Sequence, residues 1–280
     1  MVRRNCLCLL VLLTCIGLWL AGKTIAQVAQ DDDIADVPSE LAFAECDKHK
    51  RYYLIGAGEQ ISAPKEGFGL VIVLPGGDGG ARFASFVKRI YKYSLSKEYL
   101  VAQLVAVKWM PRQKVVWPTE KVKVDNQEFS TEEFVEAVVE DIKAKYKINE
   151  QRIFALSWDS SGPAGYAVSL QKEKSVTGSY IAMSEFKPEE LEPLEQAAGH
   201  CYFIDHSPDD KVSPFEKAKQ AFRTLREYGA QTEMVAYKGG HGWKGAVYIR
   251  IGKGIRWLEF ATDKQSQEKK SVQTQQKPSN

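Results

Sequence analysis

The sequence predicts an α/β fold, with a doubly wound and mostly parallel sheet that is covered by helices on both faces. Short, continuously apolar runs alternate along the chain with amphipathic runs at helical spacing. Strands that are apolar throughout are typical of parallel sheets buried on both faces. Hydrophobic residues make up 44% of the 280 residues and charged residues 26%. This mixture is that of a globular protein with a core, and it excludes wholesale disorder.

The predicted strands are apolar runs, several of them rich in β-branched residues. The clearest is Leu-Val-Ile-Val-Leu at residues 70–74, which ends at a glycine-rich turn. A continuous apolar run closed by such a turn is typical of a buried strand with a tight connection after it. The full set of predicted strands is residues 70–74, 99–107, 152–158, 180–183, 201–204 and 232–237.

Apolar residues at helical spacing predict helices between and after these strands. Ser130 and Glu133 form a capping box at the start of one helix. Ser213, Pro214 and Glu216 combine an N-cap, a proline in the first turn and a capping-box glutamate at the start of another. The full set of predicted helices is residues 81–93, 131–146, 162–170, 213–228 and 246–262.

The first 26 residues have the pattern of a secretory signal peptide. Arg3 and Arg4 precede an apolar run at residues 6–21, and small residues at 24–26 suit signal peptidase. We therefore expect signal peptide 1–26 to direct export, so that the protein is periplasmic or secreted. An uncleaved N-terminal segment is the alternative, and it would be the chain's one contact with a membrane.

Outside the signal peptide, the sequence predicts a single domain with polar ends. Residues 27–45 form a polar, acidic connector, and residues 263–280 are nearly free of apolar side chains, which predicts a disordered tail. The domain then covers residues 46–262, because no linker or repeat interrupts them. Cys46 and Cys201 could form one disulfide in an exported protein, although Cys201 lies in an apolar run typical of a buried thiol.

The charge balance and the motifs of the sequence limit the kinds of ligand and partner that we expect. The chain has 38 Lys and Arg against 36 Asp and Glu, a net charge of +2. A nucleic-acid-binding protein would show a strong basic bias, so we expect no nucleic-acid partner. The sequence has no CxxC or His-rich spacing and no P-loop lysine, so we also expect no metal and no cofactor.

Loops at the carboxyl ends of parallel strands carry the site in folds of this class. The first such loop, Pro-Gly-Gly-Asp-Gly-Gly at residues 75–80, lets backbone N–H groups approach a ligand closely. It predicts either an oxyanion hole or simply a tight turn. In the last, residues 237–243, His241 lies among three glycines, which favours a general base over a core histidine.

The two middle loops supply carboxylates. Residues 157–162 read Ser-Trp-Asp-Ser-Ser-Gly between a strand and a helix, the shape of a nucleophile elbow. Small residues flank Asp159 at the required spacing, whereas centring the turn on Ser160 puts Trp158 where a small residue is needed. Asp210 follows a strand, where a carboxylate can orient an imidazole or stay a solvent-exposed turn residue.

With these residues in place, the chain resembles the α/β-hydrolase superfamily, and among its members the secreted dienelactone-hydrolase-like, feruloyl-esterase-like and polyhydroxybutyrate-depolymerase-like esterases. The order of nucleophile, acid and histidine is that of the superfamily. The resemblance implies that Asp210 is the acid, that His241 is the base, and that the N–H groups of Gly77 and Ser160 form the oxyanion hole. It also implies the α/β-hydrolase fold without a large cap domain, because the segment 185–199 is short.

The function implied by the resemblance is an exported carboxylic-ester hydrolase for a small-molecule or polymeric ester. The elbow departs from the family pattern Gly-x-Ser-x-Gly-Gly, because Asp159 stands where the nucleophilic serine is expected. Three explanations stay open. Asp159 is itself the nucleophile, or Ser160 serves in a remodelled turn, or the site is catalytically impaired and the protein binds ligands or has a non-enzymatic role.

Overall fold

The computed structural model describes residues 31–58 and 62–275 and divides the chain into two compact units, residues 1–37 and 38–280. In the first unit the described residues include the short 3-10 helix η1 (Asp32–Ile34). The predicted signal peptide 1–26 lies outside the described residues. Among the residues that are described, no helix has the length and apolar character needed to cross a bilayer.

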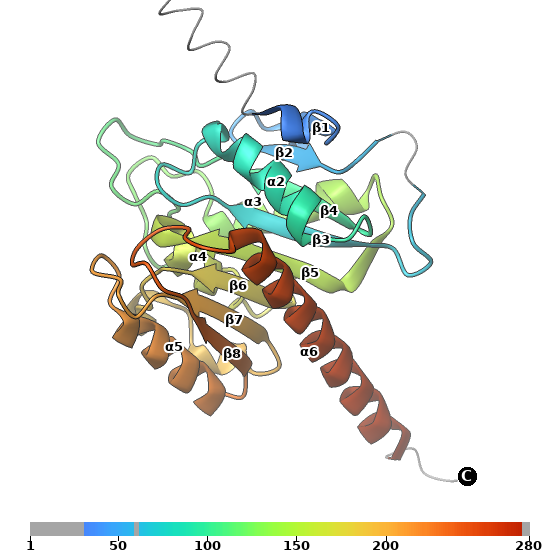
Figure 1. The fold of residues 1–280 in the computed structure, drawn as a ribbon, viewed down its shortest axis with the longest axis vertical. Coiled ribbons are helices and arrows are strands. Elements are labelled where there is room, and N and C mark those ends of the chain that lie inside the picture. The colour runs from blue at the N-terminus through green and yellow to red at the C-terminus, as the bar shows by residue number, and fades with distance from the viewer. Residues whose placement is uncertain (1–30, 59–61, 276–280) are drawn as a thin grey trace, which may run out of the picture. The chain divides into compact units, whose positions relative to one another are not determined.

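The second unit is built on an eight-stranded sheet with the order β1-β2-β4-β3-β5-β6-β7-β8 (Figure 1). The pairs β1–β2 and β2–β4 are antiparallel, and every other neighbouring pair is parallel. The fold class predicted from the sequence is therefore confirmed. The strands are β1 (Ser39–Phe43), β2 (Arg51–Ile55), β3 (Phe68–Leu74), β4 (Tyr99–Leu104), β5 (Ile148–Trp158), β6 (Gly178–Ala182), β7 (Cys201–His206) and β8 (Gln231–Ala236).

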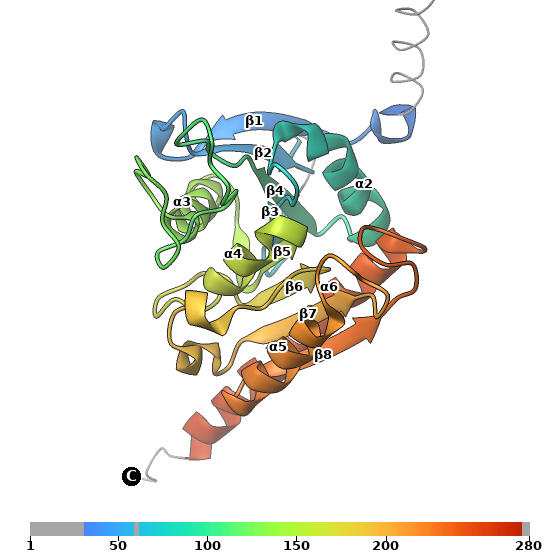
Figure 2. The same ribbon diagram turned by 90° about the vertical axis from the view of Figure 1, so that its left-hand side faces the viewer.

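Helices cover both faces of this sheet (Figure 2). Because strand side chains alternate, Tyr180 and Phe203 face the long C-terminal helix, whereas Ile181 and Ile204 pack in the core on the opposite face. One face carries α2 (Ala84–Ser94) and α6 (Val247–Gln275), and the other carries α3 (Thr131–Lys143), α4 (Gly162–Ala167) and α5 (Phe215–Glu227).

The connection between β6 and β7 holds no helical cap, only the short 3-10 helices η5 (Pro188–Glu190) and η6 (Leu194–Ala197). The edge of the sheet above α4 is therefore left open to a ligand. Cys46 is exposed and Cys201 is buried, and the two remain free thiols.

Two predicted boundaries need correction. Strand β1 lies within the expected connector 27–45, where it pairs with β2 as an exposed edge strand. Its apolar run, Leu-Ala-Phe at residues 41–43, is short and largely exposed, so it does not stand out as a strand among the polar residues around it. The last helix was expected to end at residue 262, but α6 continues to Gln275 through the first part of the expected tail. Asp263 pairs with Arg152 at 3.1 Å, and no proline or glycine interrupts the segment that follows.

The two predicted capping boxes have different outcomes. At α3 the Ser130 hydroxyl accepts the Glu133 N–H and the Glu133 carboxylate accepts the Ser130 N–H, as predicted. At α5 the prediction is wrong, because the helix begins after Pro214 without a side-chain cap. The N–H of Ser213 instead donates to Asp210 Oδ1 at 2.9 Å, so the residues expected to start the helix belong to the Asp210 loop.

Glu132, in the first turn of α3, gives the fold a testable pH dependence. Its carboxylate is buried, which raises its pKa to about 7. The folded state therefore disfavours the ionised form, so stability is highest when Glu132 is protonated and falls as pH rises from about 4.5 toward 7. Glu132→Gln should be more stable than the wild type by about 3 kcal/mol above neutral pH. Urea unfolding should show the difference vanish near pH 4, and an equal difference at all pH values would contradict this account.

Candidate active site

The four predicted loops meet at the carboxyl edge of the sheet. Gly77 follows β3, Asp159 follows β5, Asp210 follows β7 and His241 follows β8. Because these strands run parallel, their carboxyl ends share one edge, and residues far apart in the sequence come within contact distance.

Asp159 occupies the tip of a sharp strand-to-helix turn. Its φ angle is 54°, in the left-handed region that a non-glycine residue enters only when the surrounding structure requires it. The Ser161 hydroxyl supports the turn by donating to the carbonyl of Leu74 at 2.6 Å and accepting the N–H of Trp158 at 3.0 Å. A Cβ on Gly76 would lie 2.3 Å from the Trp158 carbonyl oxygen, so only glycine allows this close approach. The turn therefore has the local geometry of a nucleophile elbow, centred on Asp159.

His241 lies between two carboxylates. Its Nδ1 is 2.9 Å from Asp210 Oδ2, and its Nε2 is 3.3 Å from Asp159 Oδ1. In both contacts a ring nitrogen faces a carboxylate oxygen. The glycines on either side, Gly240 and Gly242, have φ angles of 76° and 99°, which a residue with a side chain rarely adopts. Glycines therefore flank His241 because the backbone conformation that brings its ring to the two carboxylates requires positive φ angles on both sides.

Asp210 is the buried partner of this pair. Its Oδ1 accepts the N–H groups of Val212 at 2.8 Å and Ser213 at 2.9 Å, which leaves Oδ2 for His241. Burial opposes ionisation, but the hydrogen bonds from Ser213, His241 and Val212 outweigh it and lower the pKa of the Asp210 carboxyl. A second imidazole, that of His206, lies 3.5 Å from Oδ2 and contacts the Ser213 carbonyl at 2.8 Å. Asp210 is therefore held ionised and in a fixed orientation.

The predicted oxyanion donor is already occupied. Gly77 N–H donates to Asp159 Oδ2 at 3.1 Å, so this backbone donor has a partner within the protein. The Ser160 hydroxyl donates to the Gly77 carbonyl at 2.9 Å. The Ser160 side chain is thus directed toward the glycine-rich loop 75–80, whereas the Nε2 of His241 faces Asp159.

Comparison with solved structures gives high similarity in fold at low sequence identity. An α/β hydrolase, MGS-M1, from a Medee basin deep-sea metagenome library matches with a TM-score of 0.58 and 14% identity, over 80% of this chain and 98% of that one. The chain has the α/β-hydrolase fold. A Rhizomucor miehei esterase matches at 0.62 and 12% identity, over 86% and 88% of the two chains, and a Mesorhizobium loti carboxylesterase at 0.58 and 13%, over 79% and 98%. No family model and no curated protein matches the sequence.

The loop that carries His241 in this α/β-hydrolase fold is tied to the sheet by residues that the sequence analysis did not single out. Arg250 Nη1 donates to the Lys244 carbonyl at 2.6 Å, and the Tyr237 hydroxyl donates to the Gly242 carbonyl at 3.0 Å. The Arg250 guanidinium also stacks over the Tyr237 ring, and its Nε lies 3.0 Å from Oδ2 of the buried Asp205. A buried aspartate in β7 and an arginine in α6 carry no sequence signal for this pairing.

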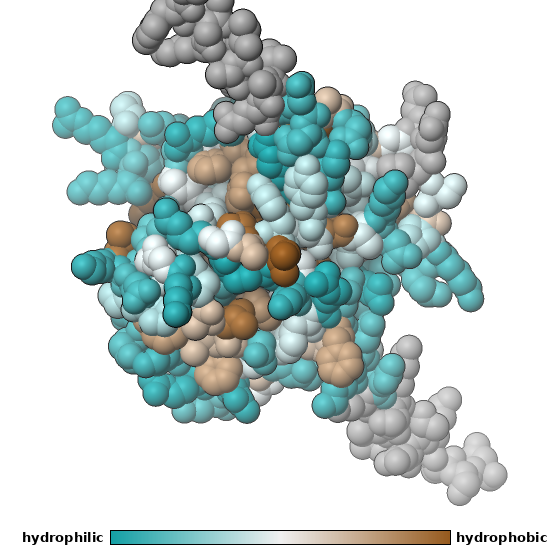
Figure 3. Space-filling model, viewed as in Figure 1, coloured by the Kyte–Doolittle hydropathy of each residue, from teal (hydrophilic) through white to brown (hydrophobic). Residues whose placement is uncertain are grey.

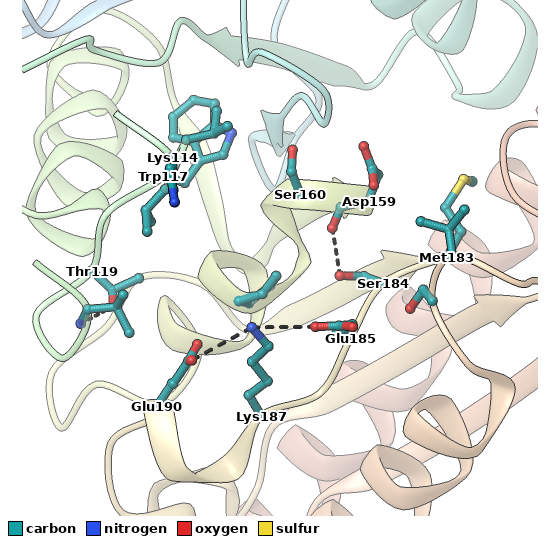
Figure 4. Close-up of a pocket in the computed structure, with 16 residues that line it drawn as sticks. Lys114, Trp117, Thr119, Asp159, Ser160, Met183, Ser184, Glu185, Lys187 and Glu190 are labelled. Carbon is teal, nitrogen blue, oxygen red and sulfur yellow. Dashed lines mark hydrogen bonds and ion pairs between the residues drawn. The ribbon is translucent and has the colours of Figure 1, made fainter. Parts of the chain in front are cut away.

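A pocket of 320 Å³ opens beside Asp159. Figure 4 shows Asp159 and Ser160 on one side of it and, on another, Lys187, which forms ion pairs with Glu185 at 3.4 Å and Glu190 at 3.7 Å. The Ser184 hydroxyl donates to the Asp159 carbonyl at 2.7 Å. The apolar part of the lining consists of Val115, Val116, Trp117, Val122, Pro163, Met183 and Val212.

No group of side chains in this site resembles a metal centre. Within residues 31–58 and 62–275, no three His, Cys, Asp or Glu side chains are grouped so that they could hold a metal ion. The carboxylates that converge on the site have other partners. Asp210 is bound by backbone N–H groups and His241, and Asp159 by Gly77 and His241.

Proposed function

We propose that this protein is an exported relative of the carboxylic-ester hydrolases and that its pocket binds esters. Asp159 restricts the wild type to binding with little or no turnover. The single observation that carries the proposal is the placement of the Asp159 carboxylate. One of its oxygens lies where an esterase nucleophile would contact the histidine, and the other holds the Gly77 N–H. The structural neighbours include an esterase and a carboxylesterase, which agrees with this class of substrate.

The chemistry of ester hydrolysis explains the restriction. A serine nucleophile gives its proton to the histidine as it attacks the ester carbonyl, and backbone N–H groups stabilise the resulting oxyanion. An ionised Asp159 has no proton to give, and its attack on an ester would form a reactive anhydride. Its second oxygen also competes with the substrate for Gly77 N–H. The same carboxylate therefore removes the nucleophile and fills part of the oxyanion hole.

The pocket supports an ester of modest size with an apolar group. Its volume of 320 Å³ is at the small end of small-molecule sites. The apolar wall formed by Trp117, Val122 and Met183 suits an acyl or alkyl chain, and the Trp117 indole is fixed by donating to the Pro75 carbonyl at 2.8 Å. A polymeric ester would have to present one such group at the open edge of the sheet.

The decisive experiment is a panel of p-nitrophenyl esters assayed with the wild type and with Asp159→Ser. Weak or absent turnover by the wild type, together with hydrolysis by the variant, supports the proposal. Export is a separate part of it and rests on residues 1–26. Mass spectrometry of the protein recovered outside the cytoplasm should give a chain that begins near Gln27, and an intact N-terminus would instead support an uncleaved segment.

One observation favours a second candidate, a hydrolase that uses Asp159 as the nucleophile on a saturated carbon. Oδ1 would displace a leaving group from that carbon to form an aspartyl ester. Water that gives a proton to a neutral His241 would then attack Cγ, the bond from Cγ to the ester oxygen would break, and the product would leave as an alcohol that takes the proton back. The Gly77 N–H on Oδ2 is positioned to stabilise the oxyanion of this second step. Single-turnover reaction with an alkyl halide or an epoxide in ¹⁸O-labelled water tests it, because the label would enter the Asp159 carboxyl. Ester turnover by Asp159→Ser together with no labelling of the wild type would reject it.

A further inference from the structure

The solvent face of α6 carries an unusual set of side chains. Ile249 is 59% exposed and Phe260 is 68% exposed, among the most exposed large apolar side chains that the structure describes. Lys253 and Arg256, also exposed, lie between them. The spacing of these residues places all of them on one side of the helix, where the two cations lie between the two apolar groups.

Helix α2 extends this face. The Tyr248 ring of α6 lies 5.5 Å from the ring of Tyr93 and 6.0 Å from that of Phe86, both on α2. A Cβ on Gly252 would lie 2.7 Å from the Ser94 carbonyl oxygen, so the two helices touch there through their backbones. Figure 1 shows α2 and α6 side by side on one face of the sheet, and Figure 3, in the same view, shows brown apolar patches among teal polar groups. We define the α2–α6 surface as Lys92, Tyr93, Ile249, Lys253, Arg256 and Phe260.

Cationic side chains predominate on the parts of α2 and α6 that form the α2–α6 surface. Residues 84–94 and 247–258 contain no Asp or Glu. The two acids that follow next on α6 have partners elsewhere, since Glu259 accepts the Tyr99 hydroxyl and Asp263 pairs with Arg152. Both segments carry three cationic residues each, in a chain whose net charge is only +2. Arg250 is committed to the buried Asp205, whereas Lys253 and Arg256 lie on the exposed side of α6. By contrast, α5 on the opposite face mixes both signs, with Glu216 and Glu227 among its basic residues.

We propose that the α2–α6 surface docks the protein on an anionic phospholipid bilayer. Cations attract the negative surface of such a bilayer, and apolar side chains that water surrounds in the free protein enter the boundary between headgroups and acyl chains. An acidic polymer would use the cations but would leave Ile249 and Phe260 in water. A tyrosine beside the cations also fits this boundary, since its ring is apolar and its hydroxyl is polar. The proposal is independent of the chemistry at Asp159.

Co-sedimentation with unilamellar vesicles tests the proposal without a substrate. We expect binding to vesicles of phosphatidylcholine with phosphatidylglycerol, weak binding to phosphatidylcholine alone, and release at high salt. Lys253→Glu/Arg256→Glu should lower the partition coefficient by at least about 30-fold. Ile249→Ser/Phe260→Ser should lower it by about tenfold or more at unchanged net charge.

Matched controls are available on other faces of the fold. Arg223→Glu/Arg226→Glu makes the same charge change at the same spacing on the exposed side of α5, and Leu41→Ser/Phe43→Ser removes two apolar groups of β1 that are 47% and 42% exposed. These variants should bind vesicles as the wild type does. All preparations carry the same N-terminus, so differences between them report on the surface. Equal loss in the α5 control, binding that ignores phosphatidylglycerol, or a Lys253→Glu/Arg256→Glu variant that changes only the oligomeric state would overturn the proposal.

Discussion

Asp159→Ser is expected to hydrolyse p-nitrophenyl acetate with a kcat/KM at least about a hundredfold above that of the wild type, the scale of a general base acting on a positioned nucleophile. The substitution supplies a hydroxyl at the tip of the elbow, where the φ angle of 54° already suits a nucleophile. It also frees the Gly77 N–H, which now donates to Asp159 Oδ2 at 3.1 Å, for the ester oxygen. His241 keeps its contact with Asp210 and faces one carboxylate instead of two.

Two variants separate the causes of this gain. Asp159→Asn removes the charge beside His241 without adding a hydroxyl, so it should stay inactive if the missing nucleophile is the main cause. Adding His241→Ala to Asp159→Ser should abolish the acquired activity. Brisk wild-type turnover that Ser160→Ala abolishes would show instead that Ser160 is the nucleophile, although its hydroxyl now donates to the Gly77 carbonyl.

The parts of the site that were predictable from the sequence are those with local chemical signals. Glycines around His241 and small residues around Asp159 are required by the backbone in their own loops, and the order of the loops follows from parallel strands. The occupation of Gly77 N–H by Asp159 Oδ2 was not predictable, because it depends on the approach of two loops more than eighty residues apart. The spacing of small residues already favoured Asp159 over Ser160 as the centre of the turn, but the contacts that each side chain makes required three-dimensional geometry.

The fold shows the same division between local and non-local signals. The buried parallel strands were visible as apolar runs, whereas β1 was not, because an exposed edge strand gains its backbone pairing from β2 and not from apolar burial. The Ser213 box failed for a related reason. Ser213, Pro214 and Glu216 are a favourable sequence for a helix start, but the Ser213 N–H donates to Asp210 Oδ1 instead. The same carboxylate contacts His241 through Oδ2, which fixes its position beside Ser213.

The network behind His241 shows most clearly what sequence reasoning missed. Asp205 is fully buried at the end of β7, and its carboxylate accepts the Tyr180 hydroxyl at 2.7 Å and Arg250 Nε at 3.0 and 3.2 Å. Burial raises the pKa of Asp205, while the Tyr180 hydrogen bond and the Arg250 charge limit the rise. Since Arg250 also holds the Lys244 carbonyl, one ion pair links the sheet to the loop of His241.

Arg250→Met should destabilise the protein by about 3 kcal/mol near neutral pH, because it leaves a buried carboxylate without its cation while keeping most of the apolar stem. The loss should shrink as the pH falls, because burial raises the pKa of Asp205 and the protonated carboxyl no longer carries a buried charge. Urea unfolding of Arg250→Met, Asp205→Asn and the double variant should give a double variant more stable than the sum of the single losses predicts.

Arg250→Met should also disturb His241, which a purely local loss of stability would not do. With Arg250 Nη1 gone from the Lys244 carbonyl, a loop rich in positive φ angles loses one of the contacts that fix it. The Tyr237 hydroxyl still donates to the Gly242 carbonyl at 3.0 Å, and the Gly240 N–H to Ser207 Oγ at 3.1 Å. In the Asp159→Ser background, the substitution should lower kcat at temperatures where both proteins are fully folded. The side-chain NMR signals of His241 should shift or broaden, while those of the buried His200 at the far end of β7 stay in place. Unchanged His241 signals and unchanged kcat would show that the ion pair stabilises the fold without positioning the histidine.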